Sequence, residues 1–157
     1  IPEEHLPDAL NFVLVLDQLR DPGNMGTILR SAEAAGVQAV FLLPGTTDPW
    51  APKVVRSGMG SHFRLPILNW GIEALEALLG DMRVYCADMN GELNYWQADF
   101  RVKTALLIGG EADGASEQGR ALANTTVSIP MVGGTESLNA AVSAALLMFE
   151  VARQRQV

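Results

Sequence analysis

The sequence contains very little of the side-chain chemistry that binds metals or forms disulfides. A single cysteine, Cys86, excludes an intrachain disulfide framework. Its apolar neighbours predict a small buried core residue rather than a reactive thiol. The two histidines, His5 and His62, have no second histidine or cysteine at metal-ligand spacing, so we expect no metal centre.

Long apolar runs and an excess of basic charge are also missing. No apolar run reaches the roughly 18 residues of a membrane helix, and the N-terminus lacks a basic-then-apolar signal pattern. We therefore expect a cytoplasmic protein with no membrane partner. The net charge of −7 argues against a general nucleic-acid binder, because phosphate contacts need a basic face. A local basic patch remains compatible with that total.

The length suits one domain that buries most of its apolar surface. Residues 1–11 are polar and broken by proline, which is typical of a lead-in or a linker remnant. The predicted domain covers 12–157. The chain begins with Ile1 rather than methionine, so we keep open a missing N-terminal segment.

Buried strands alternate with helices along the chain. Short continuous apolar runs are typical of strands covered on both faces, and the segments between them carry apolar residues at helical spacing. The pattern predicts an α/β fold with a mainly parallel sheet and helices on both faces. The expected strands lie at 12–16, 39–43, 65–68, 83–87, 105–108 and 127–129, and the expected helices at 22–35, 51–58, 71–79, 117–123 and 138–155. We expect irregular structure between the fourth and fifth strands.

Three glycine-rich turns each follow a strand, at 21–30, 109–116 and 130–139. Ligands of α/β sheets bind beyond the carboxyl ends of the strands, where free backbone N–H groups hold an adenine, a ribose or a carboxylate. We therefore expect the three turns to form one site. The usual dinucleotide, P-loop and nucleophile-elbow fingerprints are absent, which excludes the commonest nucleotide and hydrolase sites.

The turns match three motifs in order and spacing. Asn24, Gly26 and Arg30 fit Asn-x-Gly-x-x-x-Arg after a strand, and residues 109–114 fit Gly-x-Glu-x-x-Gly. The third motif, Ile-Pro-Met-x-Gly-x-x-x-Ser-Leu-Asn, is complete over 129–139. From the first strand almost to its end, the sequence resembles the SpoU (TrmH) branch of the SPOUT RNA methyltransferases.

The resemblance implies properties that composition and periodicity do not reach. The C-terminal part of the sheet would be threaded as a trefoil knot, and the protein would be a homodimer with its site at the interface. The methyl donor would be S-adenosylmethionine, leaving S-adenosylhomocysteine. The acceptor would be a ribose 2′-hydroxyl in rRNA or tRNA, most simply rRNA. Family members often carry an N-terminal RNA-binding domain, so we expect this chain alone to bind RNA weakly.

The resemblance also implies roles for individual residues. Those expected in catalysis are Arg30, Asn24, Glu111, Ser137 and Asn139. Those expected to hold the cofactor are Gly109, Gly110, Ile129, Met131, Ser137 and Leu138. The cations expected to contact RNA are Arg30, Lys53, Arg56 and Arg64, with Arg20 as a further candidate.

Several alternatives stay open at this point. The arginine of the first motif is usually described as a base, but a guanidinium keeps its proton far above pH 7. Stabilising the developing alkoxide by charge is the other role for Arg30. Asn139 and Ser137 are equally compatible with helix capping, and Glu111 with an exposed loop carboxylate. For the whole chain, the alternatives are an inactive SPOUT-fold module that binds RNA or cofactor, and a generic nucleotide-binding α/β protein of flavodoxin type.

Overall fold

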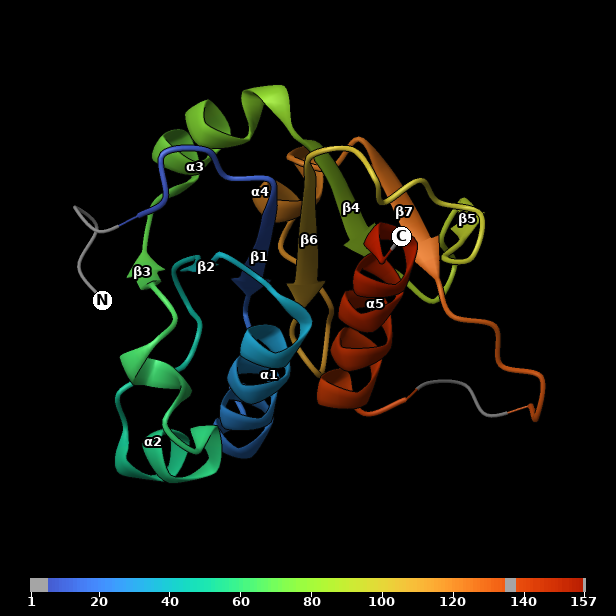
Figure 1. Ribbon diagram of the computed structural model, residues 1–157. Coiled ribbons are helices and arrows are strands. Elements are labelled where there is room, and N and C mark those ends of the chain that lie inside the picture. Colours follow the sequence, from blue (N-terminus) through green and yellow to red (C-terminus); the bar gives the residue numbers. More distant parts are fainter. Residues whose placement is uncertain (1–5, 135–137, 157) are drawn as a thin grey trace.

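The computed structural model describes residues 6–134 and 138–156. Its centre is a sheet of seven parallel strands in the order β3-β2-β1-β6-β4-β7-β5 (Figure 1). The strands are β1 (Phe12–Asp17), β2 (Ala39–Leu42), β3 (Ile67–Asn69), β4 (Arg83–Ala87), β5 (Leu93–Asn94), β6 (Thr104–Gly109) and β7 (Thr125–Ser128). This arrangement confirms the predicted parallel α/β sheet.

Helices cover both faces of the sheet, as predicted. Two buried clusters, one on each face, show that α1 and α5 pack on one side and α3 and α4 on the other, while α2 packs against α1 (Figure 1). The helices are α1 (Pro22–Ala35), α2 (Pro52–Gly58), α3 (Ile72–Leu78), α4 (Glu117–Ala121) and α5 (Ala140–Arg155), with short 3-10 turns η2 (Ser61–Phe63) and η3 (Leu79–Asp81).

Strand β1 shows why an apolar run without alternation becomes a central strand. All six of its residues are buried. Leu14 and Leu16 join the cluster under α1 and α5, whereas Val13 and Val15 join the cluster on the opposite face. Successive side chains point to opposite faces, so a strand covered on both sides needs apolar residues at every position.

The start and end of α1 follow the predicted signals. The Asp21 carboxylate accepts a hydrogen bond from the backbone N–H of Asn24 at 3.0 Å, and Pro22 occupies the first turn. Gly36 ends the helix at φ 91°, a left-handed conformation that glycine adopts without steric cost. Cys86 is buried in β4 as predicted, and burial raises the pKa of its thiol to about 11.

Local differences from the sequence prediction have local causes. Helix α5 begins at Ala140 rather than 138, because the side chain of Asn139 caps it by accepting from the N–H groups of Ala141 and Val142. The segment expected to be irregular contains β5, whose two residues are too few to show a strand periodicity. The edge strand β3 begins after Pro66, which cannot donate to a ladder.

The strand order reverses beside β1. The chain lays β2 and then β3 on one side of β1, and later inserts β6 on its other side. Asp17 at the end of β1 pairs in register with Gly109 at the end of β6. The loops after these two strands therefore leave the sheet together, at the switch point where open α/β sheets form ligand sites.

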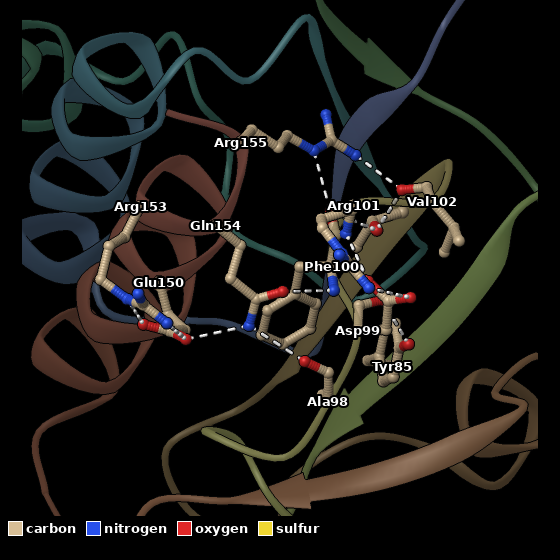
Figure 2. A network of polar contacts seen from close by, with 11 residues as sticks. Tyr85, Ala98, Asp99, Phe100, Arg101, Val102, Glu150, Arg153, Gln154 and Arg155 are labelled. Carbon is tan, nitrogen blue, oxygen red and sulfur yellow. Dashed lines mark hydrogen bonds and ion pairs between the residues drawn. The ribbon is translucent and has the colours of Figure 1, made fainter. Parts of the chain in front are cut away.

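The C-terminal end of α5 is tied to the segment that precedes β6 (Figure 2). Gln154 accepts from the N–H of Phe100 at 2.7 Å and donates to the carbonyl of Ala98 at 2.9 Å. Arg155 donates to the carbonyls of Phe100 and Val102 at 2.8 and 2.7 Å. We call Gln154, Arg155 and the segment 98–102 the α5 clamp. It fixes the last helix against the sheet.

The described part of the chain has neither a membrane-spanning helix nor a metal-binding cluster of side chains. None of its helices is long and apolar enough to cross a membrane. No group of three or more His, Cys, Asp or Glu side chains is arranged there to hold a metal ion.

Candidate active site

A cavity of about 760 Å³ opens beyond the carboxyl ends of the strands, between the loops that follow β1, β4, β6 and β7. Its size falls within the roughly 300–1,000 Å³ of small-molecule sites. Both apolar side chains and polar groups line it. The apolar part is Ile108, Val127, Ile129, Met131, Leu138 and Leu147; the polar part includes Asp21, Asn24, Asp88, Glu111, Arg120 and Asn139.

Hydrogen bonds join the three sequence motifs at this cavity. The side-chain amide of Asn139 donates to Oδ1 of Asn24 at 3.1 Å, and the amide of Asn24 donates to the Glu111 carboxylate at 3.3 Å. Glu111 also accepts from the backbone N–H groups of Arg20 and Asp21 at 3.0 and 2.8 Å. We call Asn24, Glu111 and Asn139 the three-motif network. The predicted convergence of the three turns is thus observed.

Glu111 is more than an exposed loop carboxylate. Burial by itself raises the pKa of Glu111, but the hydrogen bonds from Arg20, Asp21 and Asn24 together outweigh it, so its pKa lies below the ordinary value. The group is therefore ionised at neutral pH and acts as an acceptor. Its two oxygens hold the turn before α1 in place and orient the amide of Asn24.

The glycines of the second motif permit close approach of protein backbone. A Cβ on Gly109 would lie 2.1 Å from the backbone nitrogen of Ala115, and one on Gly110 would lie 2.2 Å from the carbonyl oxygen of Gln18. A side chain at Gly109 would distort the loop after β6 itself, and one at Gly110 would push that loop away from the loop after β1. Both glycines line the cavity, and because they have no side chains their backbone groups are open to a ligand.

Two acidic residues at the carboxyl ends of strands were not predicted, and one of them, Asp88, lines the cavity. Asp88 directly follows β4, lines the cavity, and accepts a hydrogen bond from Arg120 at 2.7 Å. That guanidinium is the main reason why the pKa of Asp88 lies below its usual range. Asp17, buried at the end of β1, accepts from both the N–H and the hydroxyl of Ser116 at 2.7 Å. Their position directly at strand ends was the signal that would have found them.

The predicted cofactor residues that the structure describes all line the cavity: Gly109, Gly110, Ile129, Met131 and Leu138. Ser137 lies outside the described residues. Arg30 is exposed on α1 and is not among the cavity-lining residues; six residues after Asn24, it lies about 9 Å further along the helix axis. The structure therefore does not bring Arg30 into the three-motif network.

The cations predicted to contact RNA are distributed near α2. Lys53 and Arg56 are exposed on α2 itself. Arg64 follows η2 and forms a two-pronged ion pair with Glu33 of α1, at 2.5 and 2.9 Å. Arg20 lies apart from this group, next to the three-motif network, through its backbone bond to Glu111.

Fold and site together define a parallel α/β protein with a ligand cavity at a topological switch point, closed by three joined loops. Residues 11–149 match the SpoU rRNA Methylase family. The chain belongs to this family.

Individual relatives agree with that assignment. The chain is 36% identical to mouse "rRNA methyltransferase 3, mitochondrial", covering 99% of this chain and 50% of that protein. It is 38% identical to the "23S rRNA (uridine(2479)-2'-O)-methyltransferase" of Streptomyces viridochromogenes, covering 97% of this chain and 56% of that protein. The crystal structure of the SpoU methyltransferase AviRb from the same organism, in complex with AdoMet, superimposes with a TM-score of 0.87 at 36% identity, covering 98% of this chain and 62% of that one. The chain thus spans about half the length of the curated relatives it matches.

Proposed function

We propose that the protein is an S-adenosylmethionine-dependent methyltransferase that methylates a ribose 2′-hydroxyl of RNA, with rRNA as the substrate class. The observation that carries the proposal is the three-motif network, which joins Asn24, Glu111 and Asn139 at the mouth of the cavity. Relatives named as 23S rRNA 2′-O-methyltransferases and the AdoMet complex of AviRb support it.

The cavity suits the proposed cofactor. Its apolar wall offers Ile129, Met131 and Leu138 to an adenine ring, and the loop after β6 offers the backbone of Gly109 and Gly110. Asn24, Glu111 and Asn139 add joined polar groups to the same lining, as in sites that orient a nucleoside. S-adenosylmethionine, when bound, supplies a sulfonium methyl group for in-line displacement.

The remaining requirements fall to side chains of the protein. Methyl transfer needs the 2′-oxygen held in line with the methyl group and relieved of its proton. Asn24 and Asn139 present amides at the cavity mouth, and Glu111 fixes the orientation of the Asn24 amide. These groups would orient the ribose. Arg30 lies outside the cavity lining, and a guanidinium is a poor base, so we assign Arg30 to holding an RNA phosphate and stabilising negative charge on the incoming oxygen rather than to proton abstraction. The proton released from the 2′-hydroxyl then passes to water.

A homodimer is part of the proposal. Helix α5 exposes an apolar stripe of Val142, Leu146 and Phe149, which recur at helical spacing and begin one turn after Asn139. A second copy packed on this stripe would stand beside the cavity and help to form the RNA site. Leu146→Glu should convert a dimer into a monomer in sedimentation velocity, whereas Phe63→Glu, at an exposed aromatic residue of η2, should not. A wild-type monomer at micromolar concentration would contradict this part.

The trefoil knot is likewise proposed. The connection 88–98 runs tightly around β7: a Cβ on Gly91 would lie 2.6 Å from the carbonyl carbon of Val127, and the N–H of Tyr95 donates to Ser128 at 2.9 Å. The α5 clamp then holds the end of this connection to the last helix. A connection that contacts both β7 and α5 supports a C-terminal segment threaded through it.

The experiment that tests the function has two parts. Isothermal titration should show S-adenosylmethionine binding to the protein, and radiolabelled methyl groups should pass to ribosomal RNA in a form that resists alkaline cleavage as a 2′-O-methyl nucleotide. Mapping 2′-O-methyl sites in rRNA and tRNA of cells with and without the gene then identifies the nucleotide. Cofactor binding without any methylated RNA would favour an inactive binding module, and absence of cofactor binding would overturn the proposal.

A second expectation concerns RNA affinity. The chain spans about half of its curated relatives and carries a net charge of −7, so we propose that a further domain supplies most of the RNA affinity. The chain by itself should bind RNA only weakly. Submicromolar affinity at physiological salt would refute this.

A further inference from the structure

The segment 48–64, which contains α2 and η2, exposes three large apolar side chains. The exposed fractions are 48% for Trp50, 63% for Met59 and 74% for Phe63. Single exposed apolar residues are ordinary on protein surfaces, but several within one short segment indicate a surface that contacts a partner. None of the three-motif residues lies in this segment, so the network does not account for them.

Trp50 is held in place from one side. Its ring lies 5.0 Å from the ring of His62, tilted by 59°. His62 is buried, with Nε2 2.6 Å from the carbonyl oxygen of Pro49, and a Cβ on Gly58 would lie 2.7 Å from the imidazole. The backbone N–H of Trp50 also donates to Asp48 at 2.9 Å. A ring supported in this way loses little entropy when a second flat group stacks on it.

Met59 is exposed and has a strained backbone conformation. It caps the C-terminus of α2 at φ 51°, in the left-handed region that glycine favours. A side chain in this conformation is sterically strained relative to glycine. The chain nevertheless places a long apolar side chain here and leaves it exposed.

The charge around these side chains is positive. Lys53, Arg56 and Arg64 accompany one acidic residue, Asp48, in the segment, whereas the whole chain has a net charge of −7. Aromatic rings combined with cations bind single-stranded nucleic acid, because bases stack on the rings and phosphates pair with the cations.

The segment lies directly beside Arg30. A Cβ on Gly26 would lie 1.6 Å from the hydroxyl of Ser57, so α1 and α2 touch there. Glu33 of α1 binds Arg64 at the other end of the segment. Arg30 is four residues after Gly26 and three before Glu33, so it lies on the same side of α1, between the two contacts.

We propose that the segment 48–64 is a stacking platform for unpaired RNA bases that flank the methylated nucleotide. Trp50 and Phe63 offer ring faces to the bases, Met59 adds apolar contact, and Lys53 and Arg56 pair with the phosphates. The inference rests on the proposed function, and it specifies the substrate: the target lies in a single-stranded loop or bulge, not in a continuous duplex.

Binding of a short single-stranded RNA, measured by fluorescence anisotropy at fixed salt, tests the platform. Trp50→Leu and Phe63→Leu should each weaken binding roughly tenfold, because stacking of one base is lost. Trp96→Leu is the matched control, since Trp96 is 61% exposed but lies in the loop after β5; it should bind like the wild type. The same RNA annealed to its complement should bind less tightly to the wild type and be insensitive to Trp50→Leu.

Kinetics separate this inference from the proposed function. With RNA as the varied substrate, Trp50→Leu should raise KM roughly tenfold with little change in kcat, while cofactor affinity stays unchanged. If the wild type methylates RNA and both Trp50→Leu and Phe63→Leu have a normal KM for RNA, the platform proposal is wrong. The proposed methyltransferase function is then unaffected. Lack of cofactor binding by the wild type would overturn the function, while oligonucleotide binding still tests the platform. Unchanged RNA affinity in both variants, whatever protein partner they lost, would also overturn it.

Discussion

The two ends of helix α5 are held by different kinds of contact. At its C-terminal end, Gln154 and Arg155 satisfy backbone groups of the segment 98–102 with several short hydrogen bonds (Figure 2). At its N-terminal end, Asn139 caps the helix with its side-chain carbonyl oxygen, and its side-chain amide donates one hydrogen bond to Asn24.

The difference separates anchoring from function. Side chains of the α5 clamp bind backbone groups of a segment that does not line the cavity, so their contribution is to stability. The amide of Asn139 bonds the side chain of Asn24 at the cavity, where the proposed substrate would compete for the same hydrogen bonds. We therefore expect changes at the clamp to lower the free energy of unfolding, and changes at the network to lower turnover.

The largest loss of turnover is expected at Arg30, which lies on α1 and at neither end of α5. Arg30→Lys keeps a positive charge but loses the planar fork that holds a phosphate or an alkoxide from two directions. Turnover should fall about a hundredfold or more, while the dissociation constant for S-adenosylmethionine stays within about twofold. Single-turnover methylation and isothermal titration measure the two quantities. Near-normal turnover of the lysine variant would show that Arg30 is not catalytic.

Asn139 allows its two roles to be separated. Asn139→Asp keeps an oxygen that accepts the backbone N–H groups of Ala141 and Val142, but it no longer donates to Asn24. It should therefore keep its stability and lose turnover at least tenfold. Asn139→Ala should lose the same turnover and, in addition, about 1 kcal/mol of stability as the cap disappears. Full activity in the aspartate variant would mean that the bond to Asn24 has no part in the reaction.

At the opposite end, Gln154→Ala should have a purely structural effect. It removes the donor to the carbonyl of Ala98 and the acceptor for the N–H of Phe100, leaving partly buried backbone groups unsatisfied. We expect a loss of about 1–3 kcal/mol in urea denaturation, with activity per folded molecule unchanged. Gln156→Ala, at an exposed neighbouring glutamine, serves as the control. A loss of turnover without a loss of stability would reverse the proposed division of labour.

The smallest effect concerns pH. The hydrogen bond from the Arg153 guanidinium, helped by Gln154, lowers the pKa of Glu150 below its ordinary value, although burial opposes the shift. A carboxyl with a lowered pKa stabilises the fold above its unfolded pKa, and this contribution is lost as pH falls through the folded pKa. Glu150→Gln should therefore be less stable than the wild type at pH 7, and the difference should shrink below about pH 4. A difference independent of pH would exclude the ionised carboxylate as its source.

Local features of the fold were predictable from neighbouring residues. The six apolar or strand-ending residues of β1, the Asp21–Pro22 start of α1 and the stop at Gly36 each depend on signals within a few positions. The convergence of the three turns was also predictable, because parallel strands present their carboxyl ends at one edge. The motif residues were found by resemblance to a family, not by these patterns.

Other features escaped prediction because their partners are distant in sequence. The bonds of Asn24 to Glu111 and to Asn139 span separations of 87 and 115 residues. The glycine of the first motif, Gly26, packs against α2, where an added Cβ would lie 1.6 Å from the hydroxyl of Ser57 and 3.0 Å from the carbonyl oxygen of Val54. Nothing near Gln154 or Asp88 in the chain indicates the α5 clamp or the pairing with Arg120.

Residue types and spacing alone predicted the parallel α/β class, the buried strands, the caps of α1 and the position of the ligand site. These depend on periodicity, capping and turn chemistry, which act over a few residues. The strand order β3-β2-β1-β6-β4-β7-β5 and every contact across it emerged only with the folded chain. Such contacts arise when elements far apart in sequence bury their apolar faces together, and a one-dimensional pattern does not specify which faces meet. The placement of Arg30 beside the segment 48–64, rather than in the network, is a consequence of that packing.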